Sequence, residues 1–207
     1  MTLSDLANSL NSRHPAGRFY PPLLLLTDEK RLADPIPAVD CLPHGSGVIL
    51  RHYNDSDRAQ LAKELSLLCH LRGLRLLIAG DGPMAMRVRA HGIHFPETRV
   101  KEAYTWRKRC PHWLITTAAH TWKSLILSAQ VRSDAALLGS VFPTESHPNA
   151  SAIGPVRFAA WVRRMKRLQR SLPIYALGGV SSSTGKRLFN SGAIGIAGIS
   201  GIARTSN

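Results

Sequence analysis

The sequence is poor in cysteine and contains no long apolar run. Its cysteines are Cys41, Cys69 and Cys110, which lie far apart and form no CxxC pair, and this argues against a disulfide framework or a zinc site. No apolar run approaches the length that spans a bilayer. The polar N-terminal segment lacks the apolar centre of a secretory signal. We therefore expect a soluble, cytoplasmic protein with reduced thiols and no membrane partner.

Acidic residues are also scarce. The chain of 207 residues has 13 of them against 27 basic residues, so its formal net charge is +14. Such a charge attracts anions, including nucleic acids, acidic lipids and phosphorylated metabolites. In residues 157–170, Phe158, Val162 and Met165 form an apolar stripe between arginines. Because no DNA- or RNA-binding motif accompanies the charge, we favour a solvated basic face over a nucleic-acid surface.

Hydrophobic residues make up 44% of the chain, enough for a sizeable core, and they fall in short runs that alternate with helix-like segments. The expected strands are residues 23–27, 47–51, 74–80, 92–95, 113–117, 135–140, 174–179 and 194–198. Apolar strands separated by helices indicate a parallel sheet covered on both faces. Eight such units predict an α/β fold, a (β/α)8 TIM barrel. The alternative is an open doubly wound sheet, but no GxGxxG follows the first strand.

The two ends of the chain depart from a regular barrel. Residues 1–20 precede the first strand and include a capped helix candidate, SDLANSLNS, whereas only a few residues follow Ile202. We expect one domain over residues 1–207, with an N-terminal extension over 1–20 and the barrel over 21–202. We predict that the leading helix covers the surface that a short or missing last helix would have covered.

Two loops rich in glycine and serine follow the last two expected strands, with a helix-like segment of about one dozen residues between them. In barrel enzymes the loops after strands seven and eight often bind a phosphate, together with a short extra helix. The sequence therefore predicts backbone contacts to a phosphate from Gly178, Gly179, Ser200 and Gly201. Arg51, at the end of the second strand, is a second candidate contact for an anion. The alternative for Arg51 is an ion pair with Asp81.

Several motifs resemble the thiamine phosphate synthase family, whose barrel is shared with the thiazole tautomerases. They are GSVFPTES followed by HP (139–148), ALGGV (176–180), GIAGISGI (195–202), GVILR (47–51), GIHF (92–95) and AAH (118–120). The resemblance runs from about residue 23 to residue 202. It implies an enzyme that joins an aminopyrimidine diphosphate to a thiazole phosphate, with loss of pyrophosphate and help from Mg²⁺.

The resemblance also suggests roles for single residues. It implies catalytic roles for Arg51, Ser140 and His147, and a substrate pocket with Thr144, His120 and His94. The metal would need carboxylates, for which Asp81 and Glu97 are the candidates. The tautomerases need an acid or base of near-neutral pKa, and their histidine aligns with Ser140.

The chain departs from the family pattern mainly where the family binds the metal and the diphosphate. Ile49 and Tyr53 replace a glutamine and a lysine around Arg51. The Asn-Asp pair after strand three is Ala79-Gly80, with Asp81 one place later. Arg99 replaces a second aspartate, Glu97 is displaced from it, and His147 replaces a lysine.

Three interpretations follow. The first is a family enzyme of thiamine biosynthesis that couples or processes a thiazole phosphate. The second is a divergent barrel that binds a phosphorylated small molecule without synthase activity, either tautomerase-like or regulatory. The third is a basic nucleic-acid-binding protein. The sequence leaves open whether the protein forms a homo-oligomer and whether it uses Mg²⁺.

Overall fold

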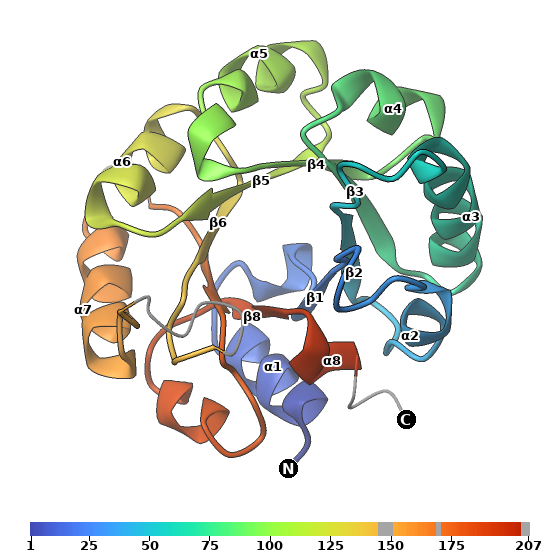
Figure 1. The fold of residues 1–207 in the computed structure, drawn as a ribbon. Helices are drawn as coiled ribbons and strands as arrows, with labels where there is room; N and C mark the ends of the chain where they lie inside the picture. The colour runs from blue at the N-terminus through green and yellow to red at the C-terminus, as the bar shows by residue number, and fades with distance from the viewer. Residues whose placement is uncertain (145–150, 169–170, 204–207) are drawn as a thin grey trace.

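The computed structural model describes residues 1–144, 151–168 and 171–203. Within them, eight parallel strands form a closed barrel in the order β1 to β8, with β8 paired to β1 (Figure 1). The strands are β1 (Leu23–Leu26), β2 (Gly47–Leu50), β3 (Arg75–Ala79), β4 (Gly92–Phe95), β5 (Leu114–Ala119), β6 (Ala135–Leu138), β7 (Ile174–Leu177) and β8 (Gly195–Gly198). The predicted (β/α)8 barrel is confirmed.

Helices surround the barrel. The α-helices are α1 (Leu3–Ser12), α2 (Ile36–Asp40), α3 (Arg58–Leu71), α4 (Gly82–Arg87), α5 (Glu102–Arg109), α6 (Trp122–Gln130), α7 (Pro155–Lys166) and α8 (Ser200–Ala203). Three short 3-10 helices are η1 (Gly17–Phe19), η2 (Glu97–Arg99) and η3 (Gly185–Leu188). None of the helices within the described ranges is long and apolar enough to cross a bilayer.

The segment between β7 and β8 differs from its prediction. The sequence suggested a helix of about a dozen residues, but among the described residues only η3 forms there. The segment starts with a capped turn, in which the backbone N–H groups of Ser181 and Thr184 each donate to the other's hydroxyl, at 2.9 and 3.2 Å. Gly185 then lies against Leu6 of α1, where a Cβ would clash.

The core consists of two layers separated by the barrel wall. Alternate strand residues point to opposite faces, so one set fills the barrel and the other packs under the helices. The inner set contains Leu24, Leu26, Ile49, Leu77, Ala79, Leu114, Ala135, Leu137, Tyr175, Ile194 and Ala197. The outer layer is larger and includes the buried faces of α1 and α7. This packing makes the barrel interior a solid core, as in other barrels of this type.

Helix α1 covers the part of the barrel beside β8. Thr2 caps it, with reciprocal bonds to Asp5. Its residues Leu3, Leu6, Ala7 and Leu10 are buried, and the helix lies beside β8, β1 and η3 (Figure 1). Helix α8 has only four residues. The prediction that a leading helix compensates for a short last helix is therefore confirmed.

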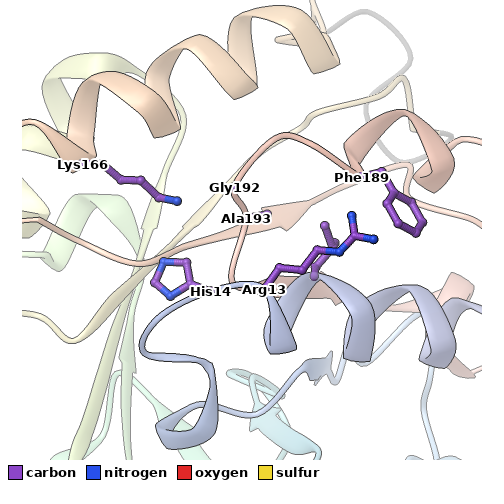
Figure 2. Close-up of a pocket in the computed structure, with 7 residues that line it drawn as sticks. Arg13, His14, Lys166, Phe189, Gly192 and Ala193 are labelled. Atoms are coloured by element: carbon purple, nitrogen blue, oxygen red, sulfur yellow. The ribbon is translucent and has the colours of Figure 1, made fainter.

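The N-terminal end of the barrel is closed by residues around β1. The Tyr175 hydroxyl donates to Pro21 O at 2.7 Å, and Asn11 Nδ2 donates to Ile194 O at 3.0 Å. Just after α1, Arg13 and His14 face the turn that leads into β8 (Figure 2). The opposite, C-terminal end of the barrel carries the loops in which the sequence places its candidate site.

Candidate functional site

All strands run parallel, so their carboxyl ends meet at one end of the barrel. Seven strand ends carry residues that the sequence predicts for the site: Arg51 after β2, Asp81 after β3, Glu97 after β4, His120 after β5, Ser140 after β6, Gly178 and Gly179 after β7, and Ser200 and Gly201 after β8. The fold therefore brings these residues to one end. His147 lies outside the described residues.

The loops after β6, β7 and β8 pack backbone against backbone. The Val141 N–H donates to Leu177 O at 2.9 Å, and the Phe142 N–H donates to Gly178 O at 3.1 Å. A Cβ at Gly179 would lie 2.5 Å from Pro143 O, and a Cβ at Gly201 would lie 2.9 Å from Val180 O. Glycine is thus required at both positions by the close approach of neighbouring loops.

The turn at Gly179 leaves a backbone donor unused. Gly178 and Gly179 have φ values of +89° and +66°, in the left-handed region that favours glycine. Thr184 Oγ1 donates to Gly179 O at 2.9 Å, which fixes the turn. Among the described residues, nothing accepts a hydrogen bond from the Gly179 N–H. An unpaired N–H in such a turn can bind an anion.

The loop after β6 carries two hydroxyl groups, of which that of Ser140 lies next to this turn. A Cβ at Gly178 would be 2.9 Å from Ser140 Oγ, so the serine lies directly against the glycine. Thr144 Oγ1 is buried and has no hydrogen-bond partner within the described ranges. A buried hydroxyl without a partner is costly, and a bound ligand would relieve that cost. The catalytic role predicted for Ser140 and the substrate contact predicted for Thr144 stay predictions.

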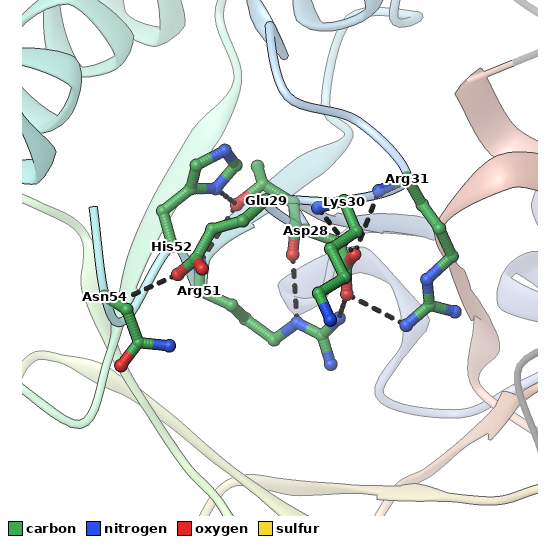
Figure 3. A network of polar contacts seen from close by, with 8 residues as sticks. Asp28, Glu29, Lys30, Arg31, Arg51, His52 and Asn54 are labelled. Carbon is green, nitrogen blue, oxygen red and sulfur yellow. Dashed lines mark hydrogen bonds and ion pairs between the residues drawn. The ribbon is translucent and has the colours of Figure 1, made fainter.

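Arg51 is anchored to the end of β1 (Figure 3). Its Nε donates to Thr27 O at 2.9 Å, and its Nη2 donates to Asp28 Oδ2 at 2.8 Å. Burial raises the pKa of Asp28, but hydrogen bonds from Arg31 and the charge on Arg51 outweigh this and lower the pKa. The ion-pair partner of Arg51 is Asp28 and not Asp81, which corrects the alternative drawn from the sequence.

A backbone carbonyl next to Arg51 determines which nitrogen of His52 carries the proton. His52 Nε2 lies 3.2 Å from Ala33 O, and because a carbonyl only accepts, Nε2 carries the proton. His52 Nδ1 then accepts from Thr27 Oγ1 at 2.8 Å, and Thr27 Oγ1 accepts the Arg51 N–H at 3.0 Å. These hydrogen bonds hold the backbone of Arg51 at the end of β2, while Thr27 O and Asp28 hold its guanidinium group.

Sequence reasoning missed the arginines beside Arg51. The Arg58 guanidinium lies 5.4 Å from the centre of the Tyr53 ring. Arg58 and Arg99 donate to carbonyls at the end of β3, at 2.6 and 2.9 Å. The pKa of Tyr53 is raised by burial, and the positive charges of the three arginines oppose this effect without outweighing it. Arg99 also pairs with Glu102 at 2.6 Å. The sequence did hint at this cluster, because Tyr53 and Arg99 replace a lysine and an aspartate of the family pattern.

Asp81 and Glu97 are not arranged as a pair of metal ligands. Asp81 Oδ1 caps α4 by accepting the Met84 N–H at 2.8 Å, and its Oδ2 lies 3.8 Å from Arg58. Glu97 Oε2 lies 3.8 Å from His120 Nε2. The described residues contain no group of three or more His, Cys, Asp or Glu that could hold a metal ion. Each of the two carboxylates thus already has a partner within the protein, Asp81 at the start of α4 and Glu97 at His120. The sequence Asp81-Gly82-Pro83 is typical of a helix start and could have predicted that Asp81 caps α4.

His120 has a defined tautomer at this end of the barrel. Its Nδ1 lies 2.7 Å from Gly139 O, so Nδ1 carries a proton and donates it to the carbonyl. The remaining nitrogen, Nε2, faces Glu97. The side chain is 55% exposed, which leaves Nε2 accessible. Among the described histidines at this end, His120 therefore has the geometry of a proton donor or acceptor.

His94 differs from His120 because it lies inside the barrel wall. The residue is 3% exposed, and its Nδ1 lies 2.9 Å from Thr116 Oγ1 on β5. Burial, with a smaller effect of the Arg51 charge, lowers the pKa of His94 to about 3. The imidazole is therefore neutral at physiological pH.

Comparison with known proteins agrees with this arrangement. The sequence matches the family described as thiamine monophosphate synthase over residues 26–202. The chain belongs to the thiamine monophosphate synthase family. A thiamine-phosphate synthase homologue of Aquifex aeolicus is 32% identical over 148 residues, covering 70% of this chain and 75% of that protein. The thiamine-phosphate synthase of Geobacillus kaustophilus is 26% identical over 178 residues, covering 81% and 78%.

A solved structure of similar fold comes from the same family. The thiamine phosphate pyrophosphorylase from Pyrococcus furiosus superposes with a TM-score of 0.72 at 19% identity, covering 89% of this chain and 91% of that one. At this identity the likeness shows the fold. The family membership that the motifs suggested is confirmed by the sequence matches, and with it a place in thiamine biosynthesis.

Proposed function

We propose that the C-terminal end of this barrel binds a thiazole phosphate and couples it to an aminopyrimidine diphosphate. The observation that carries the proposal is the turn at Gly178 and Gly179. Its backbone is held by the neighbouring loops, and the Gly179 N–H finds no acceptor in the part of the chain that the structure describes. A phosphate would supply that acceptor, with Ser200 and Gly201 beside it on the loop after β8.

Arg51 supports the second half of the proposal. In the coupling, the thiazole nitrogen forms a bond to the pyrimidine methylene carbon, and the bond from that carbon to the diphosphate breaks. The leaving diphosphate takes the electron pair and carries negative charge. Arg51 is held by Thr27 and Asp28 through Nε and Nη2, which leaves Nη1 to meet an anion. A fixed cation of this kind lowers the barrier because it need not reorganise during the reaction.

His120 supports a proton-transfer role in the same site. With Nδ1–H donating to Gly139 O, Nε2 is the nitrogen that takes up or releases a proton. Glu97 Oε2 lies 3.8 Å from this nitrogen, so the proton would be exchanged on the side of His120 that faces Glu97.

One observation favours a second candidate, a barrel that binds the thiazole phosphate without coupling it. Asp81 is used as a helix cap and Glu97 faces His120, so the carboxylates that the family reaction needs for Mg²⁺ are committed elsewhere. Magnesium dependence stays a prediction. The two candidates share the phosphate turn and differ in turnover.

Phosphate binding can be tested by replacing Ser200 with aspartate. Ser200→Asp places a negative charge beside the phosphate turn and needs no change of backbone, unlike a substitution at Gly179, where a Cβ would strike Pro143 O. We expect affinity for thiazole phosphate, measured by calorimetry, to fall by roughly two orders of magnitude from a like charge at close range. Ser182→Asp is the control, because Ser182 is exposed on the loop after β7. Equal affinity in both variants would place the phosphate elsewhere.

A further inference from the structure

A basic pocket lies at the N-terminal end of the barrel, opposite the candidate site (Figure 2). It is lined by Arg13 and His14 after α1, Lys166 at the end of α7, Phe189, and the turn at Gly192 and Ala193 before β8. The pocket is small and partly open to solvent, so it has room for a small group and not for an extended cofactor.

The basic side chains of this pocket come from different segments and have no acidic partner. None of Arg13, His14 and Lys166 forms an ion pair with a carboxylate among the described residues. Burial and the Lys166 charge lower the pKa of His14. A basic residue at a helix C-terminus ordinarily serves the helix dipole. That role does not explain why the ends of two helices bring their basic groups to one hollow.

Each basic group is also oriented to donate. His14 Nδ1 accepts the Ala16 N–H at 3.2 Å, so even the neutral ring carries its proton on Nε2. The Arg13 guanidinium lies over the Phe189 ring, 4.4 Å from its centre. The ring contacts the flat face of the guanidinium, and the N–H groups along the guanidinium edge are left to donate hydrogen bonds. A Cβ at Gly192 would lie 3.0 Å from Lys166 Nζ, so glycine there gives room for the ammonium group.

We propose that this basic pocket is a second anion site, which takes the phosphate group of a small phosphorylated molecule. Arg13, Lys166 and His14 Nε2 donate to the phosphate oxygens, and the apolar side chains of Leu10 and Ala193 line the remaining wall. The site lies across the barrel from the turn at Gly179 and does not rest on the function proposed for that turn.

Histidine resonances give a direct test, with inorganic phosphate as the probe. In protein labelled at histidine, the ring signal of His14 is assigned by its loss in His14→Gln. We expect phosphate to shift this signal to saturation, and sodium chloride at equal ionic strength to leave it unshifted. Lys166→Gln should weaken the phosphate affinity at least about tenfold, because a charged hydrogen-bond donor is lost. Lys63→Gln, an exposed change on α3, should leave it unaltered.

Comparison with Ser200→Asp separates this site from the one at the other end. We expect Ser200→Asp to keep the full response of His14 to phosphate, whatever happens to thiazole phosphate binding. A His14 signal that does not move with phosphate, or that moves equally with chloride, would overturn the second site. An unchanged phosphate affinity in Lys166→Gln would overturn it as well.

Discussion

At the scale of single residues, backbone carbonyls decide the chemistry of two histidines at the C-terminal end of the barrel. His52 donates from Nε2 to Ala33 O and accepts at Nδ1 from Thr27, so both of its ring nitrogens are hydrogen-bonded within the protein. His120 donates from Nδ1 to Gly139 O and keeps Nε2 accessible. The same residue type is thus structural in one position and available for proton transfer in the other.

The buried His94 predicts how stability depends on pH. Its pKa is about 3 in the folded protein and about 6.5 when unfolded, so the unfolded state binds more protons between these values. Stability from this group is complete above about pH 6.5 and is lost as pH falls towards 3. We expect His94 alone to lower the free energy of unfolding by about 2 kcal/mol between pH 7 and pH 5, as measured by urea denaturation.

The variant His94→Gln isolates this effect. It removes the titrating ring and keeps a polar side chain near Thr116, so the loss between pH 7 and pH 5 should shrink by about 2 kcal/mol. His112→Gln changes an exposed histidine and serves as the control. If His94→Gln loses as much stability on acidification as the unmodified protein, the imidazole is not buried as described.

At the scale of elements, the strands were predictable and the segments around β8 were less so. Apolar runs such as residues 23–26 and 47–50 are buried in full, and such runs are characteristic of strands covered on both faces. The segment before β8 was predicted as a helix because its length allows one. Among the described residues only a short 3-10 helix forms there, and it begins at Gly185, which lies against Leu6 in a contact between distant parts of the chain.

The contact of α1 with the barrel predicts a large effect for one leucine. Leu6 is 1% exposed and lies against Gly185. We expect Leu6→Ala to lower the free energy of unfolding by about 2–5 kcal/mol, through lost burial and the cavity left behind. Leu67→Ala is the matched control, since Leu67 on α3 is 64% exposed, and should cost less than about 0.5 kcal/mol. Similar losses in urea denaturation would mean that α1 does not cover β8.

At the scale of the whole molecule, the two proposed anion sites lie at opposite ends of the barrel and differ in their charged groups. The C-terminal end has glycine turns and arginines that are mostly paired with carboxylates, while the basic pocket at the N-terminal end has three basic groups without a carboxylate partner among the described residues. Part of the net charge of +14 is therefore concentrated in the basic pocket, and is not only a solvated face. Separated sites of this kind fit a protein whose ligands are phosphorylated.

The sequence predicted much of the C-terminal site because parallel strands bring their carboxyl ends together. It therefore placed Arg51, His120 and the glycine loops at one end of the barrel. It did not predict that Arg51 pairs with Asp28, because that contact joins two strand ends whose side-chain directions depend on Thr27 and His52. The basic pocket was missed for a similar reason, since Arg13 and Lys166 are distant in sequence and line one pocket only in the folded chain.

The most direct test of the proposed function is turnover. The protein is mixed with an aminopyrimidine diphosphate and a thiazole phosphate, with and without Mg²⁺, and thiamine phosphate is measured by mass spectrometry. We predict formation of thiamine phosphate at an enzymatic rate, and a loss of roughly 100-fold or more in Arg51→Gln if Arg51 stabilises the leaving diphosphate. Failure to form product, while thiazole phosphate still binds in a Ser200-dependent way, would contradict the coupling activity and leave a phosphate-binding barrel.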